Sequence, residues 1–138
     1  YKLDWLKKVT AFIAEELKQH KKLVVLGDFN VAPADIDVRH PEMWEGKVLC
    51  SESERAAFQR LLRIGLKDSF RLFQQAEKSY SWWDYRMLAF RRNWGLRIDH
   101  ILVSEDLAEC CKKCWIDVEP RKQTQPSDHT PVVAEFAC

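Results

Sequence analysis

Three short polar motifs, each beside an apolar run, hold the side chains that could do chemistry in this sequence. The first is Gly27-Asp28-Phe29-Asn30, directly after the apolar run 23–26. In an extended chain Asp28 and Asn30 point to the same side, while Phe29 points back into the core. A carboxylate beside an amide can orient a water and donate a hydrogen bond to a developing oxyanion. An ordinary turn after a strand uses the same residue types, so both interpretations stay open.

The second motif places a carboxylate inside an apolar segment. Asp99 lies in the sequence LRIDHILV over 96–103. A carboxylate among such neighbours stays ionised only if a partner pairs with it or donates a hydrogen bond to it. By strand alternation Arg97 shares a face with Asp99 and is one candidate partner. The other is a histidine elsewhere in the chain, held in orientation by Asp99.

The third motif is Ser127-Asp128-His129, just before the apolar run 132–136. Adjacent side chains rarely share a face, so we expect different roles, with His129 binding a phosphate oxygen and Asp128 approaching a metal. The other histidines are predicted to lie outside a site: solvated at His20 and His40, and packed with hydrogen bonds at His100.

A basic and aromatic segment spans 82–97. It contains four Arg and one Asp, a net charge of +3, interleaved with aromatic residues. Arg side chains can contact backbone phosphates, and aromatic side chains can stack against unstacked bases. The alternative is a packed loop in which Arg side chains lie over Trp faces.

Helices and strands mix along the chain in a pattern that predicts an α/β (α+β) fold. Apolar residues at helical spacing predict a helix over 3–17, and the apolar run 23–26 is typical of a strand buried in the middle of a sheet. Ser53 is predicted to cap a second helix, which ends at Gly65. Further strands are predicted at 80–83, 97–103, 115–118 and 132–136, with a short helix at 104–111.

Length and composition indicate one ordinary globular unit. The 138 residues carry 22 Lys and Arg against 21 Asp and Glu, and 46% are hydrophobic, which excludes wholesale disorder. No apolar run approaches the roughly 20 residues that span a bilayer, and we expect a cytoplasmic protein without a membrane partner. The five cysteines are predicted to be reduced, and the cluster Cys110, Cys111 and Cys114 to be small buried residues rather than a metal site.

In this order, the motifs resemble the endonuclease/exonuclease/phosphatase superfamily, and within it the exodeoxyribonuclease III branch of abasic-site repair nucleases. The resemblance rests on GDFN with Pro33, YSWWDYR over 80–86, GLRID over 95–99 and SDHTPV over 127–132, and it extends through 107–111. Phosphatases of the superfamily share the first and last motifs, whereas the two middle ones point to DNA repair. The resemblance to this family implies that the chain forms half of a four-layer α/β sandwich, with a mixed, mostly antiparallel sheet flanked by helices.

The resemblance also implies roles for individual residues. Asp28 orients or deprotonates the attacking water, and Asn30 supports the phosphate or its transition state. Asp99 pairs with His129, which contacts the scissile phosphate. Asp128 helps in the metal region, where Asp28 and Asn30 are further candidate ligands. The implied cofactor is Mg²⁺, with Mn²⁺ as an alternative, because a hard cation offsets the charge on the phosphoryl oxygens.

The implied substrate is duplex DNA with abasic sites or 3′ ends. Trp82 and Leu96 match positions that line an abasic-sugar pocket, and Arg86 sits where a side chain reaches into the duplex. Arg91 and Arg92 complete the predicted DNA-binding set.

One departure from the family is large. Its N-terminal half supplies a metal-binding glutamate, a neighbouring asparagine and a tyrosine that contacts the phosphate, and no segment here matches them. Tyr1 falls close to where that half would end, so we expect residues 1–138 to be the C-terminal portion of such an enzyme, inactive alone, with the N-terminal half as a partner. Two alternatives stay open: a phosphatase of the same superfamily, and a non-catalytic DNA-binding module.

Overall fold

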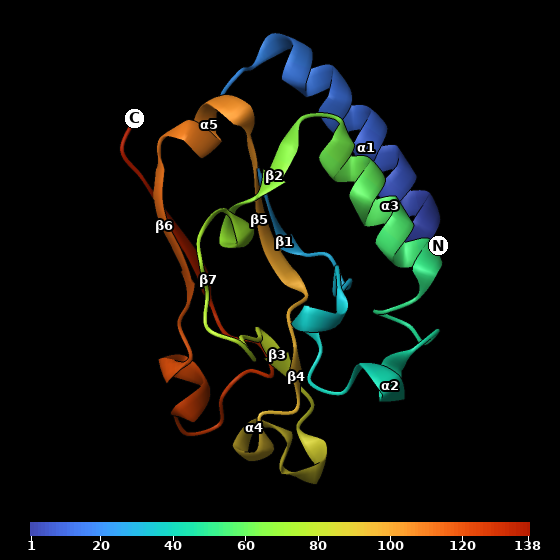
Figure 1. The fold of residues 1–138 in the computed structure, drawn as a ribbon, viewed down its shortest axis with the longest axis vertical. Coiled ribbons are helices and arrows are strands. Elements are labelled where there is room, and N and C mark those ends of the chain that lie inside the picture. Colours follow the sequence, from blue (N-terminus) through green and yellow to red (C-terminus); the bar gives the residue numbers. More distant parts are fainter.

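A computed structural model describes all 138 residues and confirms a mixed α/β fold (Figure 1). The helices are α1 (Lys2–Gln19), α2 (Pro41–Trp44), α3 (Glu52–Arg63), α4 (Ala89–Arg92) and α5 (Glu105–Glu109). The strands are β1 (Val24–Asp28), β2 (Leu66–Asp68), β3 (Trp82–Trp83), β4 (Gly95–Leu96), β5 (Asp99–Ser104), β6 (Cys111–Ile116) and β7 (Val132–Phe136). Short 3₁₀ turns lie at Asp35–Asp37, Ser69–Leu72, Arg86–Leu88 and Glu119–Lys122. No helix has both the length and the apolar character needed to cross a membrane.

The strands form three antiparallel groups, in the orders β1-β5-β2, β3-β4 and β6-β7. Helices α1 and α3 lie side by side against one face of the first group (Figure 1). The main core lies between them and contains Leu6 and Ile13 from α1, Phe58 and Leu61 from α3, and Leu102 from β5. The helical spacing of 3–17 therefore predicted the helix and most of its buried face, with Val9 and Leu17 partly buried against the core, but Leu3 and Phe12, expected on the same face, are exposed.

Strand β1 differs from its prediction, because it lies at an edge of its sheet and is largely exposed. Alternation turns Val25 toward the helices, where it packs against the core, while its neighbours face the other side. Val24 is 41% exposed and Leu26 is 64% exposed. The apolar run thus belongs to a strand that is apolar on both faces. Residues of this chain cover only one of the two faces.

Several element boundaries also differ from the sequence prediction. Helix α3 is capped by Ser51 rather than Ser53: the Ser51 hydroxyl accepts from the Glu54 amide at 3.2 Å, and the Glu54 carboxylate accepts from the Ser51 amide at 3.2 Å. This reciprocal pair is a capping box, which satisfies two amides at once. The strand predicted at 115–118 is β6, which begins four residues earlier and ends two residues earlier.

The cysteine prediction was wrong for one pair. Cys110 and Cys138 form a disulfide, while Cys50, Cys111 and Cys114 are free and buried, as expected for small apolar residues. Pairing of β6 with β7 explains the bond, because the Ala137 amide donates to the Cys110 carbonyl at 2.8 Å and brings the chain end alongside. A count of cysteines cannot reveal that proximity.

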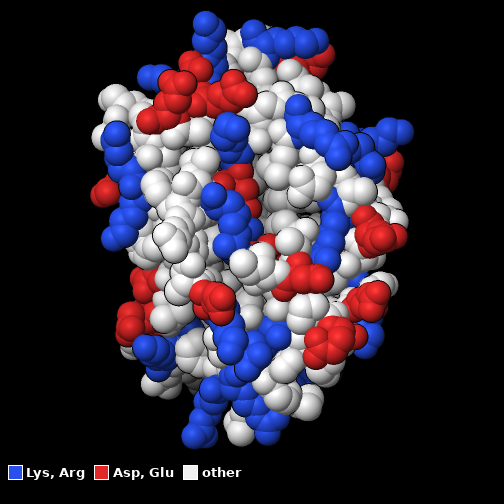
Figure 2. All heavy atoms as spheres, viewed as in Figure 1, with Lys and Arg blue, Asp and Glu red and all other residues white.

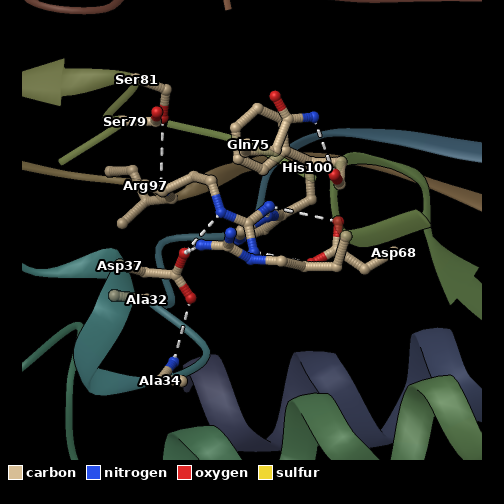
Figure 3. A network of polar contacts seen from close by, with 12 residues as sticks. Ala32, Ala34, Asp37, Asp68, Gln75, Ser79, Ser81, Arg97 and His100 are labelled. Carbon is tan, nitrogen blue, oxygen red and sulfur yellow. Dashed lines mark hydrogen bonds and ion pairs between the residues drawn. The ribbon is translucent and has the colours of Figure 1, made fainter. Parts of the chain in front are cut away.

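A buried ionic network joins β2, the turn at 35–37 and the residues between β4 and β5 (Figure 3). Arg97 is 1% exposed, and its guanidinium donates to Asp37 at 2.7 Å and to Asp68 at 2.7 Å. Burial alone would raise the pKa of Asp68, but the charge and hydrogen bonds of Arg97 outweigh it and lower that pKa. Arg97 is therefore not the partner of Asp99 that alternation suggested.

His100 packs beside this network, as predicted. It is 1% exposed, its Nε2 lies 2.8 Å from the Val31 carbonyl, and its Nδ1 lies 3.2 Å from the Arg97 guanidinium. Burial and the charge of Arg97 together lower the pKa of His100 to about 4, against the opposing effects of Asp68, Asp37 and the hydrogen bond to Val31. The imidazole is therefore neutral in the folded protein at pH 7.

Replacing Arg97 by Met tests the network. The substitution leaves the buried Asp68 without its hydrogen-bonded cation and leaves Asp37 with Arg71 alone, so we expect the free energy of unfolding to fall by about 3–5 kcal/mol. Urea denaturation followed by circular dichroism measures the loss. Arg86→Met is the matched control, since Arg86 pairs with Asp84 at the exposed surface, and it should leave the midpoint unchanged. Equal midpoints for both variants would contradict the account.

His100 predicts a loss of stability in acid. The unfolded imidazole binds a proton below pH 6.5, whereas the folded one resists it until about pH 4, so stability present above pH 6.5 falls as the pH drops through this window. The contribution lost is about 3 kcal/mol. Urea midpoints at a series of pH values should show a shallower decline between pH 6.5 and 4 for His100→Gln than for the wild type. Parallel curves would contradict the prediction.

Candidate active site

The pairing of β1 with β5 brings two of the predicted site residues together. Asp28, the last residue of β1, lies directly opposite Asp99, the first residue of β5. Like charges in opposite positions of an antiparallel pair destabilise a sheet. A cation or a hydrogen-bond donor is therefore required between them.

His129 fills that requirement. Its Nδ1 donates to the Asp99 carboxylate at 2.9 Å, and its Nε2 lies 3.7 Å from an Asp28 oxygen. One imidazole thus bridges two carboxylates from different strands. The hypothesis that a distant histidine partners Asp99 agrees with this geometry, and Arg97 is engaged elsewhere.

Electrostatics favour the charged form of the bridging imidazole. Partial burial would lower the pKa of His129, but the hydrogen bond and charge of Asp99, together with the charges of Asp28 and Asp128, outweigh it and raise that pKa. An imidazole held in this way keeps a fixed orientation and can present a proton toward an anion bound above it.

Strand β3 holds the segment that carries His129. Trp82 forms an isolated antiparallel bridge with His129, and the Trp83 amide donates to the Asp128 carbonyl at 3.0 Å. Beneath them the buried Ser81 hydroxyl accepts from the Asp99 amide at 3.2 Å. Sequence analysis assigned no role to Ser81, although a hydroxyl within a strand that ends in two tryptophans is an available signal.

Asp128 lies beside the bridge but makes its main contact elsewhere. One of its oxygens accepts from the Trp82 indole at 3.0 Å, and the other lies 3.9 Å from the His129 Nε2. Adjacent residues therefore do point differently, as predicted, yet both border the same cluster.

Asn30 departs from the extended geometry that the sequence suggested. It adopts a left-handed conformation with φ of 52°, and its backbone N–H donates to the Asp28 carboxylate at 2.9 Å. This is the hydrogen bond by which an Asp side chain forms a turn. Asp28 therefore both forms a turn after β1 and borders the candidate site. Lys2 in α1 fixes the turn, because its ammonium donates to the Asn30 carbonyl at 2.7 Å and pairs with Glu54.

The donor set fits a hard divalent cation. Ligand atoms of Asp28, Asp99 and His129 lie within 4.8 Å of one another, but Asp99 and His129 are hydrogen-bonded to each other. The carboxylate of Asp28 is the oxygen donor of this group that no hydrogen bond to His129 occupies, and the Asp128 carboxylate lies 3.9 Å from the same imidazole; carboxylate oxygens are ligands that hard divalent cations prefer. Carboxylates also outnumber the one imidazole, so the cluster has an excess of negative charge.

The basic and aromatic segment forms one end of the molecule, where Figure 2 shows Lys and Arg gathered over the region of α4. Arg91 and Arg92 are exposed there, and Arg92 also lies 4.6 Å from the Trp94 ring. Arg86 is exposed but held by Asp84 through two hydrogen bonds, at 3.0 and 2.7 Å. Phosphate contact and packing over aromatics, the two interpretations left open, thus coexist in this segment.

Trp82 and Leu96 occupy paired positions of β3 and β4. Trp82 is half-buried and borders the site, whereas Leu96 is only 1% exposed. Leu96 therefore supports Trp82, which packs against the same apolar cluster, and is not itself open to a bound molecule. His40, predicted to be solvated, is half-buried with its ring 5.3 Å from that of Trp94, because the turn before α2 folds back on this segment.

Comparison with known proteins gives the family. The model of the endonuclease/exonuclease/phosphatase family matches residues 1–129. The chain belongs to this family. Among its curated relatives, exodeoxyribonuclease III of Haemophilus influenzae is 44% identical over 129 residues, covering 86% of this chain and 48% of the relative. An exodeoxyribonuclease of Bacillus subtilis is 39% identical, with 96% and 51% covered.

Solved structures of family members share the fold. A 3′ phosphatase from Neisseria, bound to a product DNA hairpin, superimposes with a TM-score of 0.95 at 48% identity, covering 98% of this chain and 52% of that one. An AP endonuclease from Archaeoglobus fulgidus gives a TM-score of 0.91 at 36% identity, with 99% and 53% covered. This family member therefore spans about half the length of the relatives it matches.

The dependence of His129 on Asp99 can be measured directly. Replacing Asp99 by Asn removes the largest interaction that raises the pKa of His129, so that pKa should fall in a proton NMR titration of the metal-free chain. Asp128→Asn is the matched control and should lower it less, because that carboxylate is 3.9 Å away. Equal shifts in the two variants would contradict the geometry.

Proposed function

We propose that this chain carries the water-activating and phosphate-binding part of a Mg²⁺-dependent DNA nuclease of the exodeoxyribonuclease III type. The reaction is hydrolysis of phosphodiesters 5′ to abasic sites, with 3′→5′ exonuclease and 3′-phosphatase activities. The observation that carries the proposal is His129 bridging Asp99 and Asp28 beside Asp128. Names of the relatives support it, since they include exodeoxyribonucleases, an AP endonuclease and a 3′ phosphatase.

The residues divide the chemistry between them. Asp28 accepts a proton from the attacking water or orients it, because its carboxylate is half-exposed at the strand end. His129 binds a phosphoryl oxygen with the nitrogen that Asp99 does not occupy, and Asp99 keeps the ring in place. Asn30 adds an amide donor for the transition state. Asp28, Asn30 and Asp128 would hold Mg²⁺, which would supply positive charge against the phosphate.

Several features favour DNA over small phosphoesters as substrate. Arg86, Arg91 and Arg92 are exposed in one segment that adjoins Trp82, and Trp82 touches the catalytic cluster through Asp128. A small phosphoester needs no such extended basic surface, whereas a DNA backbone binds along one. The superfamily phosphatase is therefore the second candidate.

We further propose that residues 1–138 are the C-terminal portion of the catalytic domain. Support comes from the half-length match to relatives and from the exposed apolar face of β1. The family resemblance adds a metal-binding glutamate from the N-terminal half, which no segment of this chain matches. The chain alone is then inactive or nearly so.

Cleavage of an abasic duplex in Mg²⁺ tests the proposal. The chain is assayed alone and mixed with the part of the Haemophilus relative that it does not cover, and only the mixture should cut. Asp28→Asn should slow the mixture by about 10²–10⁴-fold, the usual contribution of a general base. Asp4→Asn on the exposed face of α1 is the matched control and should leave the rate unchanged.

The outcomes separate the candidate functions. Full activity of the Asp28→Asn mixture would remove the role given to Asp28. Hydrolysis of a small phosphoester without cleavage of DNA would favour the phosphatase. Tight DNA binding by a mixture that never cuts would favour the non-catalytic module.

Neutralising the basic segment gives an independent test of DNA binding. Changing Arg86, Arg91 and Arg92 to Gln should weaken duplex binding and reduce the slope of log K against log salt by about 2–3, since each phosphate contact contributes about 0.9. Fluorescence anisotropy at several salt concentrations measures the slope. Changing the exposed Lys7, Lys8 and Lys18 of α1 to Gln removes the same charge and should leave the slope unaltered.

A further inference from the structure

Arg121 is one of the two buried arginines of the chain, the other being Arg97. It lies in the 3₁₀ turn Glu119–Lys122 and is 8% exposed. We infer that Arg121 is a positioning residue, which holds the turn 85–90 of the basic and aromatic segment in shape and fixes it to the loop that leads to His129. The inference rests on the proposed function, because it explains how this chain keeps that segment in place for DNA.

Aromatic rings, rather than carboxylates, are the partners of the Arg121 guanidinium. Its Cζ lies 4.9 Å from the centroid of the Phe90 ring and 5.6 Å from that of Tyr85. Its Nε is buried without a hydrogen-bond partner, whereas Arg97 donates to two carboxylates. A cation removed from water costs free energy unless it is compensated, and ring faces attract a cation most strongly where water is excluded. The two rings therefore set the place of the guanidinium, and the guanidinium holds the two rings.

The turn between these rings needs such support. Met87 and Leu88 have φ of 60° and 54°, in the left-handed region that costs free energy for residues other than glycine. Both side chains are exposed, so neither anchors the turn in the core. Tyr85 precedes them and Phe90 follows them, so Arg121 contacts the turn at both ends. One buried cation thus holds together a backbone that its own residue types do not favour.

The same region connects the turn to the candidate catalytic residues. The Tyr85 hydroxyl donates to the Pro126 carbonyl at 3.0 Å. Pro126 lies two residues before Asp128 and three before His129. Arg121 belongs to the same connection between β6 and β7. Its contacts and this hydrogen bond therefore fix the turn, with the exposed arginines beside it, relative to His129.

Binding of an abasic duplex at several salt concentrations separates positioning from direct contact with DNA. Arg121→Met removes the charge and keeps a long apolar side chain. Fluorescence anisotropy should show about tenfold weaker binding by the 138-residue chain, the scale of desolvated cation–π contacts. The slope of log K against log salt should stay at the wild-type value, whereas loss of a phosphate contact would reduce it by about 0.9.

Two further single variants complete the comparison. Arg121→Lys keeps a cation over the rings and should bring the affinity back to within about threefold of the wild type. Arg63→Met removes an exposed arginine from the last position of α3 and is the matched control. It should leave both affinity and slope unchanged. Circular dichroism checks that each variant is folded.

A double-mutant cycle with Phe90→Leu tests whether Arg121 acts through the ring. Both substitutions remove the same cation–π contact, so their effects should not be independent. In the Phe90→Leu chain, the additional loss caused by Arg121→Met should shrink from about tenfold to about threefold or less, because only the contact with Tyr85 then remains to be lost.

The outcomes separate the inference from the function on which it rests. Failure of the wild type to bind the duplex overturns both. Wild-type affinity in Arg121→Met overturns the positioning role and leaves DNA binding intact. A slope reduced by about 0.9 also overturns the role, because Arg121 would then contact a phosphate itself. An Arg121→Lys chain that binds as weakly as Arg121→Met, or a full tenfold loss in the Phe90→Leu chain, overturns it as well.

Should Arg121→Met not fold, Phe90→Leu decides alone. Weaker binding at the wild-type slope, together with a shifted NMR resonance of the Arg121 Nε–H, supports the positioning role. Unchanged affinity or an unchanged resonance overturns it.

Discussion

A buried guanidinium is the constraint on which the rest of the structure depends. Arg97 lies between the carboxylates of Asp37 and Asp68, which come from a turn and from a strand far apart in the sequence. Ions removed from water are stable only when their partners are in place, so these segments must assemble together. Asp99 follows Arg97 by two residues and opens β5. The place of the candidate catalytic carboxylate is therefore fixed by an ionic network that does not itself touch the site.

The candidate site, which is partly exposed to solvent, likewise depends on a positive group between carboxylates. Asp28 and Asp99 face each other across a strand pair, an arrangement that costs free energy unless a positive group lies between them. His129 provides that group, but a single imidazole does not balance three carboxylates. A phosphodiester would meet repulsion there without a cation, whereas the Arg residues of the neighbouring segment attract it. Separate negative and positive regions, joined by Trp82, account for how one chain could hold both a metal and DNA.

The sequence predicted correctly which side chains need a partner. It failed to predict the partner where that residue lies far away along the chain. A carboxylate among apolar residues needed a partner, and this led correctly to a histidine for Asp99. Alternation could not show that Arg97 turns to Asp37 instead, since 60 residues separate them. The apolar run at Leu26 predicted burial on both faces, but alternation within an edge strand leaves one face open. Helical spacing needed no distant information and predicted α1 itself, although Leu3 and Phe12 of its expected apolar face are exposed.

Hydrogen exchange of the Arg97→Met variant, followed by mass spectrometry, tests most directly whether the buried network holds the site together. The account predicts faster exchange in peptides that cover 29–39, 66–72 and 97–100, because these segments lose their shared cation. Peptides that cover β6 and β7 should keep their wild-type rates, since their pairing does not include Arg97. Unchanged exchange in those three peptides, or equal acceleration along the whole chain, would contradict the account.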